Sequence, residues 1–290
     1  MRISDQSYYA LNRQSLQARR ADVQKAQVRA ASGKRVEKPS DDPIAASRAA
    51  KERAREQRLR ASERSLDAGR TRVDVQEQAL GDIAERLRRA KELSVQANND
   101  TLSANVRDAV AVEVREISEA IRSLANARDG ESYVFSGFAS DAPAFDAAGV
   151  YQGDGGIPTI EVAEGPRIPA GVAGDTAFGV GVDPLFSVLA DFEAALLAND
   201  EAALQATLQR IDDASERVIL ARSEVGGSQA AIDIARETVI RVRDYTIEAQ
   251  QALVGIDETD AFTELQQVTV AYQAAVQIAS QVPQPGLVNR

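Results

Sequence analysis

The stretch SGKRVEKPSDDPIAAS, residues 32–47, decides how this chain folds, because it ends one helix and starts another. Gly33 can end a helix, since glycine readily takes the left-handed backbone found at helix C-termini. Pro39 and Pro43 are excluded from helix interiors. Asp42 is placed to accept a backbone N–H bond as N-cap, with Pro43 in the first helical position, where its missing donor costs nothing. We therefore expect a joint here, followed by a long helix.

Prolines and glycines divide the remaining sequence into helical spans and one irregular segment. No proline occurs between Pro43 and Pro143, or between Pro184 and Pro283. Residues 137–184, in contrast, hold ten of the 18 glycines and five of the nine prolines. These separate short β-prone pieces such as residues 158–162. The sequence predicts a small β-rich insertion over 137–184 in a mainly α-helical protein.

Heptad patterns predict that the proline-free spans are long, packed helices. The first span has an apolar residue at every seventh position, at Leu59, Leu66, Val73, Leu80 and Leu87. A break near Ser103, an expected cap, leads to a second stripe, so rod helices are expected over 44–136. After the insertion, Asp183 and Pro184 repeat the cap-then-proline start, and one returning rod helix is expected over 185–254. The predicted fold is an elongated, antiparallel, coiled-coil-like helical rod.

Composition argues against an enzyme. Cys and His are both absent, which removes thiol nucleophiles, imidazole bases and metal sites built from either side chain. Only 4% of the residues are aromatic, which favours thin bundles over a thick globular interior. Asp41 and Asp42 are adjacent carboxylates without a third oxygen donor at a useful spacing, so they are a weak Ca²⁺ signal. We expect no catalytic residue, no cofactor and no metal.

The net charge of −10 hides an asymmetry along the chain. Residues 1–91 hold 22 Lys and Arg against 13 Asp and Glu, or +9, so residues 92–290 hold 12 against 31, or −19. The basic part lacks the aromatic interleaving of a nucleic-acid surface, and its arginines alternate with acidic residues. We expect no nucleic-acid partner. Instead, helices of opposite charge can lie side by side and be aligned by their fields.

The two ends of the chain are expected to be helices with incomplete apolar seams. Residues 1–43 contain one heptad series, at Tyr9, Leu16, Val23 and Ala30. Residues 255–290 contain an apolar face at Phe262, Leu265, Val268, Tyr272, Val276 and Ala279. Such weakly amphipathic helices are unstable alone, so they could pair and bury their seams only between neighbouring copies. The alternative is a free-standing bundle whose terminal helices complete its own core.

Both ends also resemble one protein family. GKR followed by PSDDPIAAS, within residues 33–47, resembles the same region of the flagellin family, and more closely that of its hook-filament junction members. The ending QVPQPGLVNR is similar to the end of flagellins. The resemblance covers residues 1–140 and 185–290. It implies terminal assembly helices inside a tube, a rod outside them, and a joint at Gly33, Ser40, Asp41, Asp42 and Pro43.

The function implied by the resemblance is a structural junction in the bacterial flagellum. Copies of the chain would form a short layer of tube between a hook-side hook-associated protein and the flagellin filament. The implied partners are further copies, flagellin, that hook-side protein and an export chaperone. Family members leave through the flagellum's own channel, so an extracellular location without a cleaved signal peptide is expected. No run of 18 apolar residues occurs, so membrane insertion is not expected.

Two other functions stay open at this point. A short flagellin that forms the filament itself would fit the final ten residues, whereas residues 32–47 and the insertion favour the junction protein. A cytoplasmic coiled-coil signalling module would also be built from long helices. That module requires no central β insertion, and residues 137–184 count against it.

Overall fold

The computed structural model describes residues 2–98, 103–181 and 183–281, and side chains between residues 10 and 280. The chain divides into two compact units. We name residues 1–57 with 243–290 the terminal unit, and residues 58–242 the central unit. Two long helices, α2 (Pro43–Ala97) and α6 (Glu201–Val254), contribute residues to both units.

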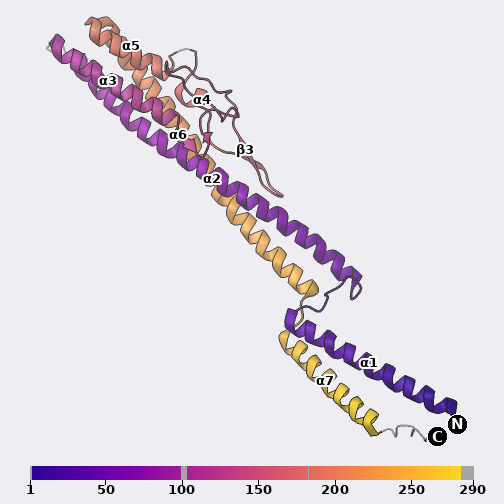
Figure 1. Cartoon of the computed structure of the whole chain (residues 1–290). Helices are drawn as coiled ribbons and strands as arrows, with labels where there is room; N and C mark the ends of the chain where they lie inside the picture. The colour runs from indigo at the N-terminus through magenta and orange to yellow at the C-terminus, as the bar shows by residue number, and fades with distance from the viewer. Residues whose placement is uncertain (1, 99–102, 182, 282–290) are drawn as a thin grey trace, which may run out of the picture. The chain divides into compact units, whose positions relative to one another are not determined.

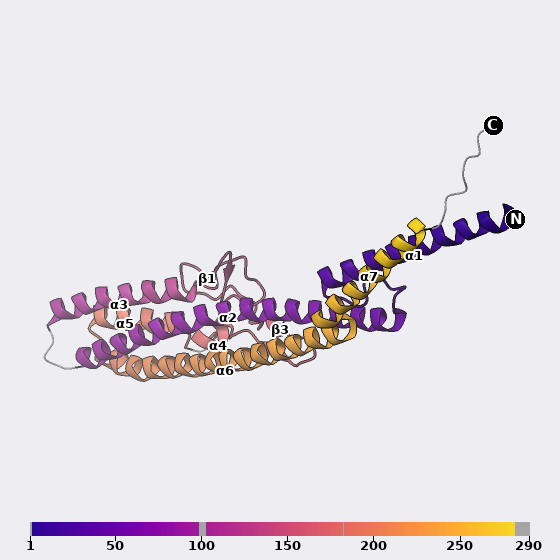
Figure 2. The same ribbon diagram turned by 90° about the horizontal axis from the view of Figure 1, so that it is seen from below.

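The central unit is a helical bundle formed by parts of α2 and α6 with α3 (Ala104–Ala125) and α5 (Leu185–Ala198) (Figures 1 and 2). Its core follows the heptad predicted from the sequence. The five positions are all buried, at Leu59, Leu66, Val73, Leu80 and Leu87. They belong to one continuous apolar cluster that also includes residues of α3, α5 and α6. The predicted antiparallel helical rod is therefore confirmed for this unit.

Ion pairs between α2 and α6 follow the antiparallel register of the two helices. The pairs are Asp67–Arg236 at 2.6 Å, Arg70–Asp233 at 2.8 Å, Glu77–Arg222 at 2.8 Å and Lys91–Asp212 at 2.5 Å. Residue numbers fall along α6 as they rise along α2, and both helices carry both signs of charge. Exposed pairs of this kind contribute little net stability. Their consequence is a preferred alignment, because a shifted register would bring like charges together.

The prediction of one returning helix over 185–254 is wrong, because the chain forms two helices there, α5 and α6. Asn199 has left-handed backbone angles (φ 51°, ψ 38°) and ends α5. The Asp200 carboxylate then accepts the backbone N–H of Ala203 at 3.1 Å, which caps the start of α6. Asn tolerates the left-handed region and Asp is a favoured N-cap, so this dipeptide separates two helices without proline or glycine.

Two expected caps also differ in detail. Ser103 is the N-cap residue of α3, with extended backbone, but its hydroxyl makes no capping hydrogen bond. At α5 the N-cap position belongs to Pro184, not to Asp183. The Asp183 carboxylate instead accepts a hydrogen bond from Nε of Arg210 at 2.6 Å. This ion pair joins the entry of α5 to α6.

The insertion over 137–184 contains less strand than expected. Its strands β3 (Thr159–Glu161) and β4 (Arg167–Pro169) form one antiparallel hairpin, with Ile160 opposite Ile168. A shorter hairpin of β1 (Arg128–Asp129) and β2 (Ser132–Tyr133) precedes the insertion, and the five-residue helix α4 (Gly174–Phe178) follows β4. Most remaining residues are loops, because the closely spaced glycines and prolines favour turns over ladders.

Aromatic rings attach these loops to the bundle. Phe178 meets Phe135 edge-on at 5.2 Å between ring centroids, and Phe145 edge-on at 5.4 Å. Phe145 also packs on Phe186 of α5 at 5.0 Å. All four rings are buried. The few aromatic residues of the chain are therefore concentrated where irregular backbone has to be held against helices.

A buried amide of α2 holds two loops of the central unit. Gln76 is fully buried, and its Nε2 donates to the carbonyls of Val134 at 2.7 Å and Val172 at 2.8 Å. Its Oε1 accepts the backbone N–H of Val172 at 3.0 Å. Gly171 has φ +107°, and a Cβ there would lie 1.8 Å from Oε1 of Gln76. One side chain thus satisfies three backbone groups that have no helical or strand partner.

We predict that Gln76→Leu lowers the free energy of unfolding of the central unit by about 3 kcal/mol, because it leaves buried backbone groups unpaired. Gln78→Leu is the matched control, since Gln78 is exposed on the same helix and its side chain bonds Asp82 and no other described side chain. The control is expected to change stability by less than about 0.5 kcal/mol. Urea unfolding followed by circular dichroism measures both, and equal effects would contradict the role given to Gln76.

Candidate functional site: the terminal helix pair and its joint

The terminal unit contains an antiparallel pair of helices, α1 (Arg2–Ser32) and α7 (Glu258–Gln281), which pack along each other (Figures 1 and 2). Helix α1 runs toward the joint and α7 runs away from it. One ion pair crosses between them near the joint, from Nη1 of Arg29 to Oε1 of Glu264 at 2.9 Å. The sequence-predicted terminal helices are therefore brought together within one chain.

The contact between these helices is thin. Ala26 and Ala261, each 2% exposed, are buried. Seven of the predicted seam residues are only half-buried, namely Leu16, Val23, Ala30, Leu265, Val268, Tyr272 and Ala279. Phe262 and Val276 are exposed, at 59% and 42%. The side chain of Tyr9 lies outside the described residues. The fully buried positions of the pair are thus small alanines, and its larger apolar side chains are incompletely covered.

Further apolar side chains of the pair face away from the contact. Leu11 and Val28 of α1, and Val270 and Ile278 of α7, are all exposed. They lie outside the heptad positions, so the periodic pattern in the sequence did not indicate them. Together with Phe262 and Val276 they form an exposed apolar set on a two-helix unit. The pair on its own therefore leaves these apolar side chains in contact with solvent.

The joint is formed by backbone hydrogen bonds between two connectors that are distant in sequence. The N–H groups of Arg35 and Val36 donate to the carbonyl of Val254, at 2.7 and 3.3 Å. The N–H of Ile256 donates to the carbonyl of Gly33 at 3.1 Å. Gly33 has φ +65° and follows the end of α1, as its sequence context predicts. The α1–α2 and α6–α7 connectors are therefore tied to each other.

Side chains of the predicted joint motif reinforce this pairing. Oδ1 of Asp42 accepts the N–H of Ala45 at 3.0 Å, which caps α2 as predicted. Oδ2 of Asp41 accepts the N–H groups of Lys38 and Glu37 at 3.1 and 3.2 Å. Oδ1 of Asp41 also pairs with Nζ of Lys25, on α1, at 3.2 Å. The two carboxylates thus have different tasks, since Asp42 starts α2 and Asp41 folds the connector against α1.

The side chains of Pro43 and Ser40, the other members of the motif after Gly33, have simpler positions. Pro43 is the first residue of α2, and Ser40 lies exposed in the turn before it. A small apolar cluster of Val36, Ala45, Ala49 and Val254 closes the joint. Val254 and its neighbours were not predicted as joint residues. Their contribution is a carbonyl oxygen and a backbone N–H, for which the sequence carries no signal.

The joint carboxylates are ionised at neutral pH. The backbone N–H of Lys38 is the main cause that lowers the pKa of Asp41, and the Lys25 ammonium adds to it. The N–H of Ala45 lowers the pKa of Asp42 in the same way. Both carboxylates already accept hydrogen bonds from the protein, which favours their charged form. Among the described residues, no group of three or more acidic side chains is placed to hold a metal ion.

The fold and the joint define a class of protein: a long-helix protein whose two ends form a loosely packed pair. A family model matches residues 3–139, and its description is "Bacterial flagellin N-terminal helical region". Over these residues the chain is similar to the flagellin family. Within the part that the structure describes, no helix combines the length and apolarity needed to cross a membrane.

One curated relative and two solved structures are also similar to this chain. Flagellar hook-associated protein 3 of Salmonella typhimurium is 35% identical over 159 residues, which are 53% of this chain and 49% of the relative. The match thus spans about half the length of that relative. Bacillus cereus FlgL has a TM-score of 0.61 at 20% identity, and covers 69% of this chain and 99% of its own. The flagellar junction protein FlgL of Legionella pneumophila gives 0.57 at 16%, with 73% and 100% covered. The two structures show a shared fold.

We predict that Asp42→Ala lowers the amide-exchange protection of Ala45 several-fold at neutral pH, whereas Asp42→Asn keeps it, because asparagine also caps helices. The pKa of Asp42 is lowered by folding, so its contribution is present at neutral pH and is lost as the pH falls below about 4. Protection factors measured at pH 7 and pH 3 check both statements. Unchanged protection of Ala45 in the alanine variant would refute the capping role.

Proposed function

We propose that this chain is a non-enzymatic junction protein of the bacterial flagellum, connecting a hook-side hook-associated protein to the flagellin filament. The observation that carries the proposal is the terminal helix pair, which leaves its larger apolar side chains exposed or half-buried. The family match of residues 3–139 and the names of the similar proteins support the flagellar setting.

The mechanism that we infer is completion of the terminal pair by neighbouring copies. Burial of apolar surface contributes about 25 cal/mol per Å² removed from water. Phe262 and Val276 contribute little of this within one chain, because they stay exposed. A second pair packed on them would cover these side chains and also the half-buried seam. The predicted assembly residues of α1 and α7 would thus act between copies as well as within one.

The joint would set the geometry of the assembling helices. Its backbone bonds hold the start of α7 beside the end of α1, and Asp41 bonds both the connector and Lys25 of α1. A layer of identical copies requires every terminal pair to have the same internal register. Gly33, Ser40, Asp41, Asp42 and Pro43 would serve this purpose and not a chemical one.

The proposed partners follow from the proposed junction function. They are further copies in a layer, flagellin on one face, the hook-side protein on the other, and an export chaperone before assembly. The location would be the flagellum outside the cell, reached without a cleaved signal peptide. The signalling-module alternative requires helices without a central insertion, and residues 137–184 form loops, a hairpin and a short helix instead.

Electron microscopy of the purified chain, alone and mixed with flagellin, separates the two flagellar functions. We expect the chain alone to give short layers or no polymer, and to bind flagellin polymers at one end when mixed. The two faces of an adaptor fit different proteins and do not fit each other, so copies should not add end to end indefinitely. Long filaments grown from the chain alone would make it a short flagellin and overturn the junction assignment.

We further predict that deletion of residues 265–290 blocks incorporation into flagella but leaves the central unit folded, because none of the removed residues belongs to its core. Thermal unfolding by circular dichroism checks the fold, and filament counts in a strain that carries only the variant check assembly. Phe262→Ser is a finer variant, since this exposed side chain contributes little to the isolated chain. Its matched control is Gln266→Ser, at an exposed polar position of the same helix. Motile flagella built from the deletion variant would contradict the mechanism.

A further inference from the structure

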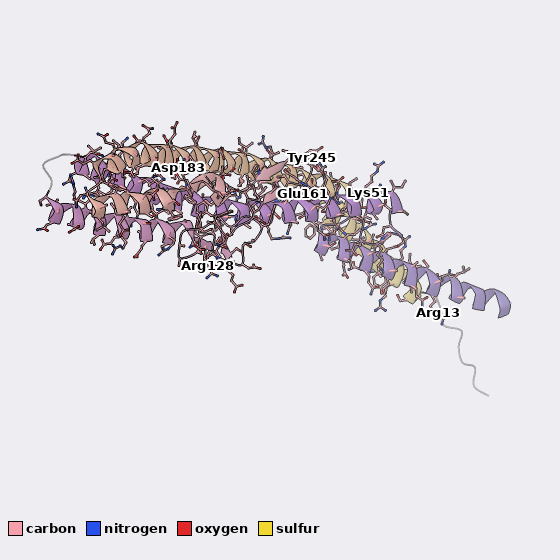
Figure 3. All side chains as sticks on the ribbon, turned by 90° about the horizontal axis from the view of Figure 1, so that it is seen from above. Arg13, Lys51, Arg128, Glu161, Asp183 and Tyr245 are labelled. Atoms are coloured by element: carbon pink, nitrogen blue, oxygen red, sulfur yellow. The ribbon has the colours of Figure 1, made fainter. Side chains whose placement is uncertain are left out.

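Helix α1 carries two exposed arginines, Arg13 and Arg20, that form no ion pair with a described acidic side chain. Arg13 and Arg20 are seven residues apart, which is about two helical turns, so they lie on the same face. Both are exposed, as is Gln17 between them, and Figure 3 marks Arg13 on α1. Within the residues that the structure describes, neither arginine forms an ion pair. This face is therefore basic and unneutralised in the single chain.

The C-terminal side of the same unit has the opposite charge. After Arg243 the sequence contains no Lys or Arg before residue 290. Glu258 and Asp260 lie exposed in the first turn of α7, and neither forms an ion pair with a described cation. Their position at a helix N-terminus already favours negative charge through the helix dipole. The dipole does not account for the unpaired arginines on α1.

These opposite charges cannot meet within one chain. The Arg29–Glu264 pair fixes which parts of α1 and α7 are level with each other. Arg20 lies nine residues from Arg29, away from the joint, and Glu258 lies six residues from Glu264, toward it. At about 1.5 Å per helical residue, Arg20 and Glu258 are about 22 Å apart along the helix axis. No side chain spans that distance.

We propose that the face of α1 with Arg13 and Arg20 in one copy lies against the N-terminal turn of α7, which carries Glu258 and Asp260, of a second copy that is displaced along the helix axis by about 20 to 30 Å. This inference rests on the proposed function and specifies the contact between copies. The second copy is chosen as the partner because its C-terminal segment offers carboxylates without competing cations. Exposed ion pairs contribute little affinity, so their effect is on register and on the choice of neighbour.

Charge reversal tests the proposal in a strain whose flagella depend on this chain. Arg13→Glu with Arg20→Glu, and separately Glu258→Lys with Asp260→Lys, are each expected to lower the number of filaments per cell at least tenfold. The four changes combined restore the number to within twofold of the unmodified chain, because attraction between copies returns with its sign exchanged. Arg58→Glu with Arg64→Glu, at exposed positions of α2, is the control for net charge and stays within twofold.

Cross-linking identifies the partner directly. The chain contains no cysteine, so Gln17→Cys with Thr259→Cys introduces the sole thiols and keeps all four charges. Within one chain these positions are about 26 Å apart along the axis, out of reach of a short bismaleimide. Assembled flagella treated with this reagent should give a ladder of multimers of this chain on a denaturing gel. The two single-cysteine variants should not form the ladder.

The failures of the two proposals are distinguishable. Normal filament numbers in both charge-reversed variants, a quadruple variant no better than either, or cross-links absent or directed to a different protein would each overturn the charge pairing. The terminal-helix mechanism would still stand if deletion of residues 265–290 blocked assembly in the same strain. Circular dichroism of each purified variant shows whether a loss reflects misfolding, which is not expected because all four side chains are exposed.

Discussion

The pairing of the two connectors by backbone hydrogen bonds is the constraint on which the terminal unit depends. Val254 accepts from Arg35 and Val36, and Ile256 donates to Gly33, so the end of α1 and the start of α7 are held side by side. This fixes the register in which the two terminal helices approach each other. The helices themselves bury only Ala26 and Ala261 fully among their described residues, and their larger seam side chains stay half-buried or exposed, so their own contact specifies the register weakly.

The two units differ in how completely they bury their own apolar side chains. The central unit covers its heptad residues fully and satisfies buried loop carbonyls through Gln76. The terminal pair exposes Phe262 and leaves Leu265 and Tyr272 half-covered. This contrast in burial is what supports the proposal that neighbouring copies complete the terminal pair.

Sequence reasoning succeeded where one residue type dictates one local structure. Gly33, Asp42 and Pro43 predicted the joint, and Leu59 to Leu87 predicted the core of α2. The contacts that could not be predicted from the sequence are those made by backbone N–H and carbonyl groups, which every residue type except proline carries in full. The Val254 carbonyl and the Val172 peptide group have no residue-specific signal, so neither the paired connectors nor the Gln76 contact could be foreseen. The Asn199–Asp200 break does have a residue-specific signal, because Asn tolerates the left-handed region and Asp is a favoured N-cap.

Charge is used differently in the two units, although both follow the same asymmetry along the chain. In the central unit, α2 and α6 neutralise each other through pairs such as Arg70–Asp233, so their charges are used within the molecule. In the terminal unit the antiparallel arrangement places Arg13 and Arg20 at one end and Glu258 and Asp260 at the other. An antiparallel pair with this distribution is uncompensated alone but self-complementary when a copy is shifted along the axis. The same arrangement that separates the charges in one chain therefore aligns them between two.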